Sequence, residues 1–163
     1  MDAVTCMTTR HSVRKYKDIP VTKEDLNKIL ECGRFAPTGV NHQGWKFIVC
    51  TDETKQKVAD ATDYGKFIAN APIVICVAID KNCACPYEDS ANAACNMLNA
   101  AHALGYGGCW IGANGNDTAK RVEKVLSVPS THKIMAIFSV GVPDEDTRRE
   151  KKPLSEIVSY NHF

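Results

Sequence analysis

Two β-branched apolar segments limit the folds that are open to this chain. Ile73 to Ile79 contains no polar residue, and Lys133 to Gly141 includes a similar run. Strands with one face in water alternate apolar and polar residues, so continuous runs predict strands that are buried on both faces. A third strand is predicted over Lys46 to Thr51, in the run that begins with Trp45.

Helical patterns surround these strands. Thr22 suits an N-cap and is followed by Asp25 in a spacing like a capping box, and the apolar spacing after it predicts a helix that stops at Pro37. Further helices are predicted from Glu53 to about Thr62 and from Thr118 to Leu126. Helices in this order with three strands indicate an α+β or a mixed-sheet α/β fold, rather than a barrel or sandwich.

The segment from Glu88 to Leu104 predicts a helix with apolar residues nearly all round it. Such a helix is expected to be buried, and its many alanines would let another helix approach closely. Either a partner subunit covers its second face, or it is the central helix of a monomer.

Composition restricts the function. The chain has 163 residues, which predicts one domain over residues 1–163. Lys and Arg number 20 against 19 Asp and Glu, so the near-zero net charge argues against a nucleic-acid-coating or polybasic membrane-binding protein. The longest apolar runs are too short to span a bilayer, and the first ten residues lack the apolar stretch of a signal peptide. A cytoplasmic protein is expected.

Eight cysteines need an explanation. Five lie in apolar segments and are expected to act as small core residues: Cys32, Cys50, Cys76, Cys95 and Cys109. Cys83 and Cys85 are expected to be exposed. They form no C-x-x-C pair and have no further ligands at suitable spacing, so no metal site is predicted. A metal or redox role for this pair remains the alternative.

Three segments carry groups suited to a ligand. If the chain is extended over Arg10 to Arg14, then Arg10, Ser12 and Arg14 share one face, and guanidinium groups suit a phosphate. A solvated basic turn is the alternative. Ala36 to Trp45 offers amides that could read the edge of a heterocycle, and otherwise forms a polar turn. The glycines of Gly105 to Gly112 would let the backbone approach a flat ligand, and otherwise form a helix C-cap and a short connection.

These motifs resemble the FMN-dependent nitroreductase family, in a compact, short-chain form. In order they are Arg-His-Ser-x-Arg, Ala-Pro-Thr-Gly-x-Asn-x-Gln-x-Trp, the alanine-rich helix, Gly-x-Gly-x-Cys-Trp-Ile-Gly and Lys-Lys-Pro-Leu. The resemblance covers nearly the whole chain. It implies an α+β, nitroreductase-like fold with a central mixed, mostly antiparallel sheet flanked by helices. It also implies an intertwined homodimer with FMN at the interface, each site being built from both chains.

The resemblance also assigns cofactor-binding residues by position. The FMN phosphate, ribityl chain and pyrimidine edge are bound by Arg10, His11, Ser12 and Arg14, with Lys151 on the phosphate. The isoalloxazine is lined from the other subunit by Pro37, Thr38, Gly39 and Asn41. The backbone near flavin N5 comes from Trp110, Ile111 and Gly112. Lys66 falls where some members place a lysine near the flavin.

The implied activity is hydride transfer from NADH or NADPH, through FMN N5, to an acceptor such as a nitroaromatic or a quinone, in a ping-pong sequence. The flavin carries the chemistry, so no catalytic side chain is expected. One alternative is a specialised enzyme of this fold, either reductive dehalogenase-like or flavin-degrading. Another is a non-catalytic FMN-binding or storage protein. Two features depart from the family. Gly44 replaces the usual proline before Trp45. The chain also lacks the inserted helices that cap the flavin in longer relatives, so only Asp80 to Tyr87 could serve as a cap.

Overall fold

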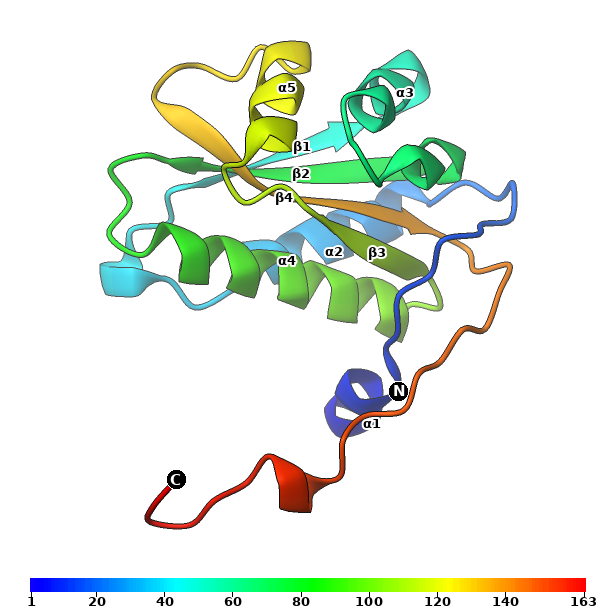
Figure 1. Cartoon of the computed structure of the whole chain (residues 1–163). Helices are drawn as coiled ribbons and strands as arrows, with labels where there is room; N and C mark the ends of the chain where they lie inside the picture. The colour runs from blue at the N-terminus through cyan, green and yellow to red at the C-terminus, as the bar shows by residue number, and fades with distance from the viewer.

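The computed structural model describes residues 1–163 and contains a four-stranded sheet at its centre (Figure 1). The strands are β1 (Trp45–Cys50), β2 (Ile73–Asp80), β3 (Gly107–Gly112) and β4 (His132–Gly141), in the spatial order β1-β2-β4-β3. Every neighbouring pair is antiparallel. The only parallel pairing is an isolated bridge between Ser12 and Gly108. The predicted α+β fold with a mostly antiparallel sheet is therefore confirmed.

Helices cover both faces of the sheet. Figure 1 shows α2 (Lys23–Arg34) and α4 (Pro86–Ala103) on one side, with α3 (Asp52–Asp60) and α5 (Asp117–Val125) on the other. The short α1 (Ala3–Thr9) lies beyond α4 and contacts it. Three short 3-10 helices complete the elements, at Gly39–Asn41, Lys66–Asn70 and Leu154–Glu156.

The two helical layers explain the apolar runs. Along β2, Ile75 and Val77 belong to the core beneath α2 and α4, whereas Val74 and Cys76 belong to the core beneath α3 and α5. All four are fully buried. Because successive side chains point to opposite faces, a strand between two layers needs apolar residues throughout. The prediction of strands buried on both faces is confirmed.

The helix starting at Thr22 is also confirmed. The Thr22 hydroxyl accepts a hydrogen bond from the Asp25 amide at 3.1 Å, as an N-cap does. The Asn116 side chain caps α5 in the same way, by accepting from the Ala119 amide at 3.0 Å. The two N-cap residues therefore fix where α2 and α5 begin.

The structure corrects the number of strands. Gly107–Gly112 forms the strand β3 along β4, not a short connection after a helix. Glycine weakens strand propensity, so the pattern alone pointed away from a strand. Here the glycines are needed because neighbours approach closely: a Cβ on Gly107 would lie 2.6 Å from Val13 Cγ2.

The burial predictions for three cysteines are wrong within the single chain. Cys95 is exposed, on a face of α4 that the chain itself leaves uncovered together with Ala103. Cys32, on α2, is also exposed. Conversely, Cys83 is buried rather than exposed, because its thiol turns inward towards the first turn of α4. The eight cysteines are all free thiols, and no His, Cys, Asp and Glu groups cluster as metal ligands.

The last part of the chain leaves the body. After β4 it runs past α1 as an extended arm that ends far from the sheet (Figure 1). Every residue from Asp146 onward is exposed. None of the helices has both the length and the apolar composition that crossing a membrane requires.

Gly108→Ala should lower the free energy of unfolding by about 1–3 kcal/mol, the usual scale of overpacking. The added Cβ would overlap the Ser139 carbonyl oxygen and lie 2.8 Å from Leu98 Cδ2. Gly112→Ala, on the same strand, is the matched control, since a Cβ there has no neighbour within 4 Å. Urea unfolding measures both variants, and equal losses would contradict the close packing at Gly108.

Candidate functional site

The N-terminal basic segment is held along the end of the sheet. The Val13 amide donates to the Gly108 carbonyl at 3.0 Å, which attaches the segment to β3. The amides of Arg14 and Lys15 both donate to Glu145 Oε1, at 2.6 and 3.2 Å. A backbone fixed at these points keeps the segment extended, as the candidate phosphate site requires.

A polar cavity of about 260 Å³ opens beside this segment. No hydrophobic residue lines it, and the lining residues are Thr8, Thr9, Arg10, His11, Ser12, Arg14, Thr147, Arg148, Arg149 and Lys151. The five residues that the family resemblance assigns to the FMN phosphate, ribityl chain and pyrimidine edge are all among them, namely Arg10, His11, Ser12, Arg14 and Lys151. Arg148 and Arg149 were not among the predicted residues, although they belong to the basic run that ends at Lys152.

The cavity is strongly cationic. Five of its residues are Arg or Lys. Arg148 is partly neutralised by Asp146, with 3.2 Å between Nε and Oδ1. The neighbouring His102 adds no charge at neutral pH, because burial and the nearby charges of His11, Arg10 and Arg148 lower its pKa. Guanidinium and ammonium groups gathered in this way suit a phosphate or another oxyanion.

His11 carries an unpaired polar atom at this cavity. Its Nδ1 lies 3.2 Å from the Thr9 carbonyl oxygen, and since a carbonyl only accepts, Nδ1 carries the proton. The other ring nitrogen, Nε2, is buried without a hydrogen-bond partner. The Asp146 carboxylate is 3.6 Å away from it. Buried polar atoms without partners are rare in native proteins, so this nitrogen marks a place where a polar ligand group fits.

The predicted backbone stretch on β3 is partly accessible. Trp110 is 38% exposed and Gly112 is exposed, whereas Ile111 packs its side chain beneath α3 and α5. Only the backbone of Ile111 could therefore touch a ligand. Lys66 points elsewhere: its Nζ donates to the Asp60 carbonyl at 2.9 Å and does not line the cationic cavity.

The remaining predicted residues form a loop at the start of α4, here called the Thr38–Gln43 loop, with Pro37 just before it. Thr38 Oγ1 donates to Asp89 Oδ2 at 2.6 Å, and the Gly39 amide donates to Asp89 Oδ1 at 2.9 Å. Pro37 and Asn41 are exposed. Asp89 was not among the predicted residues, and its side chain is nearly fully buried in the first turn of α4.

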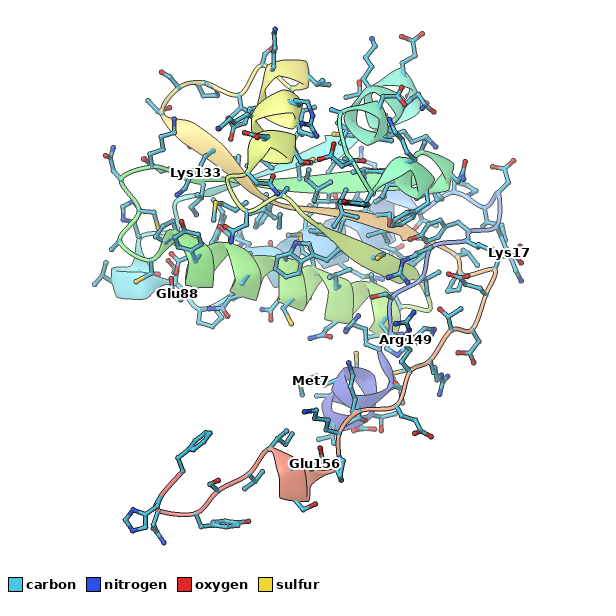
Figure 2. All side chains as sticks on the ribbon, in the orientation of Figure 1. Met7, Lys17, Glu88, Lys133, Arg149 and Glu156 are labelled. Atoms are coloured by element: carbon cyan, nitrogen blue, oxygen red, sulfur yellow. The ribbon has the colours of Figure 1, made fainter.

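The two groups of candidate residues lie at opposite ends of α4. The loop contacts Asp89 in its first turn, whereas His102, in its last turn, bonds Thr9 beside the cationic cavity. An α-helix of 18 residues is about 27 Å long. In Figure 2 the labelled Glu88 lies at the start of α4, and the labelled Arg149 lies beyond its other end. One chain therefore does not bring the loop and the cavity together.

Comparison with known proteins identifies the family. A model of the nitroreductase family matches residues 7–64 and 61–142. An Archaeoglobus fulgidus protein with the provisional name NADH dehydrogenase/NAD(P)H nitroreductase is 34% identical over 145 residues, covering 85% of this chain and 83% of its own. The chain thus belongs to the nitroreductase family and is an oxidoreductase, as its motifs predicted.

Solved structures agree. An FMN-dependent nitroreductase from Clostridium difficile superposes with a TM-score of 0.91 at 32% identity, covering 98% of this chain and 99% of its own. A protein from Desulfovibrio desulfuricans, provisionally described as a nitroreductase and solved in complex with FMN, gives a TM-score of 0.86 at 27% identity. That match covers 100% of this chain and 98% of the other. The nitroreductase-like fold is confirmed.

Asp89→Asn should cost about 1.5–3 kcal/mol of unfolding free energy at neutral pH, the scale of hydrogen bonds to a charged group. Burial alone would raise the pKa of Asp89, but hydrogen bonds from Thr38, Gly39 and Cys83 outweigh it and lower the pKa. A carboxyl with a depressed pKa stabilises the fold above its unfolded-state pKa of about 3.9, and loses that contribution as pH falls through the folded value.

The difference in unfolding free energy between the parent and Asp89→Asn should therefore be constant from pH 7 to about pH 5 and shrink below about pH 4. Urea unfolding across this range measures it. A difference that grows on acidification would contradict an ionised Asp89 bonded to the loop.

Proposed function

We propose that this chain is an FMN-dependent oxidoreductase that uses NADH or NADPH to reduce a small-molecule acceptor such as a nitroaromatic or a quinone. The observation that carries the proposal is the cationic cavity, which gathers Arg10, Ser12, Arg14 and Lys151. The FMN-bound and FMN-dependent relatives of the same fold support it. Relatives named NAD(P)H nitroreductase or NADPH-dependent oxidoreductase support the choice of reductant.

The residues present fit FMN. A phosphate dianion needs positive charges and hydrogen-bond donors, and Arg10, Arg14 and Lys151 supply the charges around the cavity. Ser12 adds a hydroxyl donor, and the unpaired Nε2 of His11 is open to a polar group elsewhere on the ligand, such as a ribityl hydroxyl. When bound, FMN would supply the redox chemistry between the nicotinamide and the acceptor. The cationic cavity would hold its phosphate, and β3 would present backbone groups to its ring.

A second copy of the chain is needed to complete this site. The Thr38–Gln43 loop and the cationic cavity are separated by the length of α4. Two copies packed through α4 in opposite directions would bring the loop of one chain to the cavity of the other. We therefore infer an intertwined homodimer with FMN at the interface, each site drawing on both chains.

Apolar surface on this face supports the dimer. A groove of about 420 Å³ lies between α1, α2 and α4, and most of its lining is apolar, including Met7, Phe35 and Ala103. The C-terminal arm exposes large apolar residues that its own chain leaves uncovered, namely Leu154, Ile157, Val158, Tyr160 and Phe163. Contiguous exposed apolar surface marks interaction sites, and a second copy would cover both features.

The purified protein should be yellow and contain about one FMN per chain. Arg10→Ala should raise the Kd for FMN about 10- to 150-fold, which corresponds to the 1.5–3 kcal/mol of a hydrogen bond to a charged group. Lys124→Ala removes an exposed charge on α5, outside the cavity, and should leave the Kd unchanged.

Fluorescence titration of the flavin-free protein measures these constants, and chromatography identifies the extracted flavin. Loss of the visible flavin absorbance on adding NADH or NADPH, followed by its recovery on adding a quinone, would separate an enzyme from a storage protein. Extraction of FAD, or no flavin binding by the parent protein, would contradict the proposal.

Light scattering should give twice the chain mass of 17.9 kDa. Met7→Glu should shift the protein towards monomer and reduce FMN occupancy, because a charge would enter the covered groove. Met7 is 59% exposed in the single chain, so the folded monomer should tolerate the change. Ser130→Glu, in the exposed turn before β4, is the control and should remain dimeric. A parent protein that binds FMN as a monomer would refute the shared site.

A further inference from the structure

A buried carboxylate joins α4 to the Thr38–Gln43 loop. Asp89 is 1% exposed and accepts three hydrogen bonds. Two come from Thr38 Oγ1 at 2.6 Å and the Gly39 amide at 2.9 Å. The third comes from the Cys83 thiol at 3.3 Å. Burying a charge is costly unless hydrogen bonds satisfy it. All three donors lie outside α4, so these hydrogen bonds hold the neighbouring chain segments against the helix.

The loop that Asp89 holds has an unfavourable backbone. Val40, Asn41 and Gln43 have φ values of +47°, +56° and +54°. Asparagine tolerates this left-handed region, but a β-branched residue such as Val40 rarely adopts it. Such conformations persist only where surrounding contacts over-determine them, and they gather at functional sites.

Asp89 supplies those contacts through Thr38. The same hydroxyl that donates to Asp89 accepts from the Gln43 amide at 3.1 Å, so the carboxylate is linked to both ends of the loop. A Cβ at Gly39 would lie 2.6 Å from Cys85 Sγ, so a larger residue there would force the Cys85 side chain to shift. The exposed Asn41 side chain has no hydrogen-bond partner and is free to meet a ligand.

We propose that Asp89 is a positioning residue that sets the conformation of the Thr38–Gln43 loop where that loop covers the flavin ring in the partner subunit's site. The inference rests on the proposed function, which brings the loop to the ring. Asp89 touches neither cofactor nor substrate in this account. It acts through Thr38 and Gly39, and the Cys83 thiol completes its set of donors.

Asp89→Asn tests the proposal, because the amide keeps the size of the side chain but loses the charge and one acceptor oxygen. The variant should raise the Kd for FMN about tenfold, or 1.4 kcal/mol, and alter the visible absorption spectrum of the bound flavin. Arg10→Ala acts on the phosphate end and should weaken binding without altering that spectrum. Glu88→Gln removes an exposed charge from the same helical turn and is the matched control.

The outcomes separate this proposal from the proposed function. If the parent protein binds no FMN, the proposed function fails. If the parent binds FMN and Asp89→Asn matches it in both Kd and flavin spectrum, the role of Asp89 is refuted while the flavin function stands. A lower melting temperature with an unchanged spectrum would likewise assign Asp89 a merely structural role.

Thr38 gives a second test if Asp89→Asn does not fold. Thr38→Val removes the hydroxyl that bonds Asp89, whereas Thr38→Ser keeps it. The valine variant should lose about tenfold more FMN affinity than the serine variant, and show the larger spectral change. Equal effects of the two substitutions would overturn the proposal.

Discussion

The antiparallel pairing of β2 with β4 is the constraint on which the rest of the molecule depends. The two strands pair from Ile73 with Val140 to Asp80 with His132, and are buried on both faces for most of that length. A central pair of this kind needs a helical layer on each side. One of these layers contains α2 and α4. The candidate ligand groups lie at the two ends of α4, so the position of this helix determines where they are found.

Helix α4 acts as a spacer as well as a core element. One face supplies Ala93, Ala94 and Met97 to the core, while its ends carry the contacts to the loop and to the cationic cavity. In the proposed dimer, neither half of the site is complete within one chain. A cavity that holds a phosphate gives affinity without a place for the ring, and a positioned loop gives a surface without an anchor.

Local sequence patterns predicted much of this fold. Continuous apolar runs identified β2 and β4, and capping at Thr22 located the start of α2. The strand β3 was missed because its glycines are required by close tertiary contacts with Val13 and Ser139. No local sequence pattern contains these contacts. The inward turn of Cys83 was missed for the same reason, since it depends on the carboxylate of Asp89.

The candidate site also contains residues that the sequence predicted and others that only the structure brought to light. Alternation over Arg10, Ser12 and Arg14 predicted an oxyanion site, and the structure places all three on one cavity. Arg148 and Arg149 were overlooked because an exposed basic run has no periodicity that marks a site. The distance between the cavity and the Thr38–Gln43 loop could come only from the three-dimensional arrangement.

Subunit complementation tests the central claim, a flavin site shared by two chains. One chain would carry Arg10→Ala in the cavity and the other Asn41→Trp in the loop, at an FMN concentration that saturates the parent but neither variant alone. If sites are shared, a mixed dimer contains one intact site, and random mixing should restore about a quarter of parental FMN binding. No recovery in confirmed mixed dimers would contradict the account, because each site would then belong to a single chain.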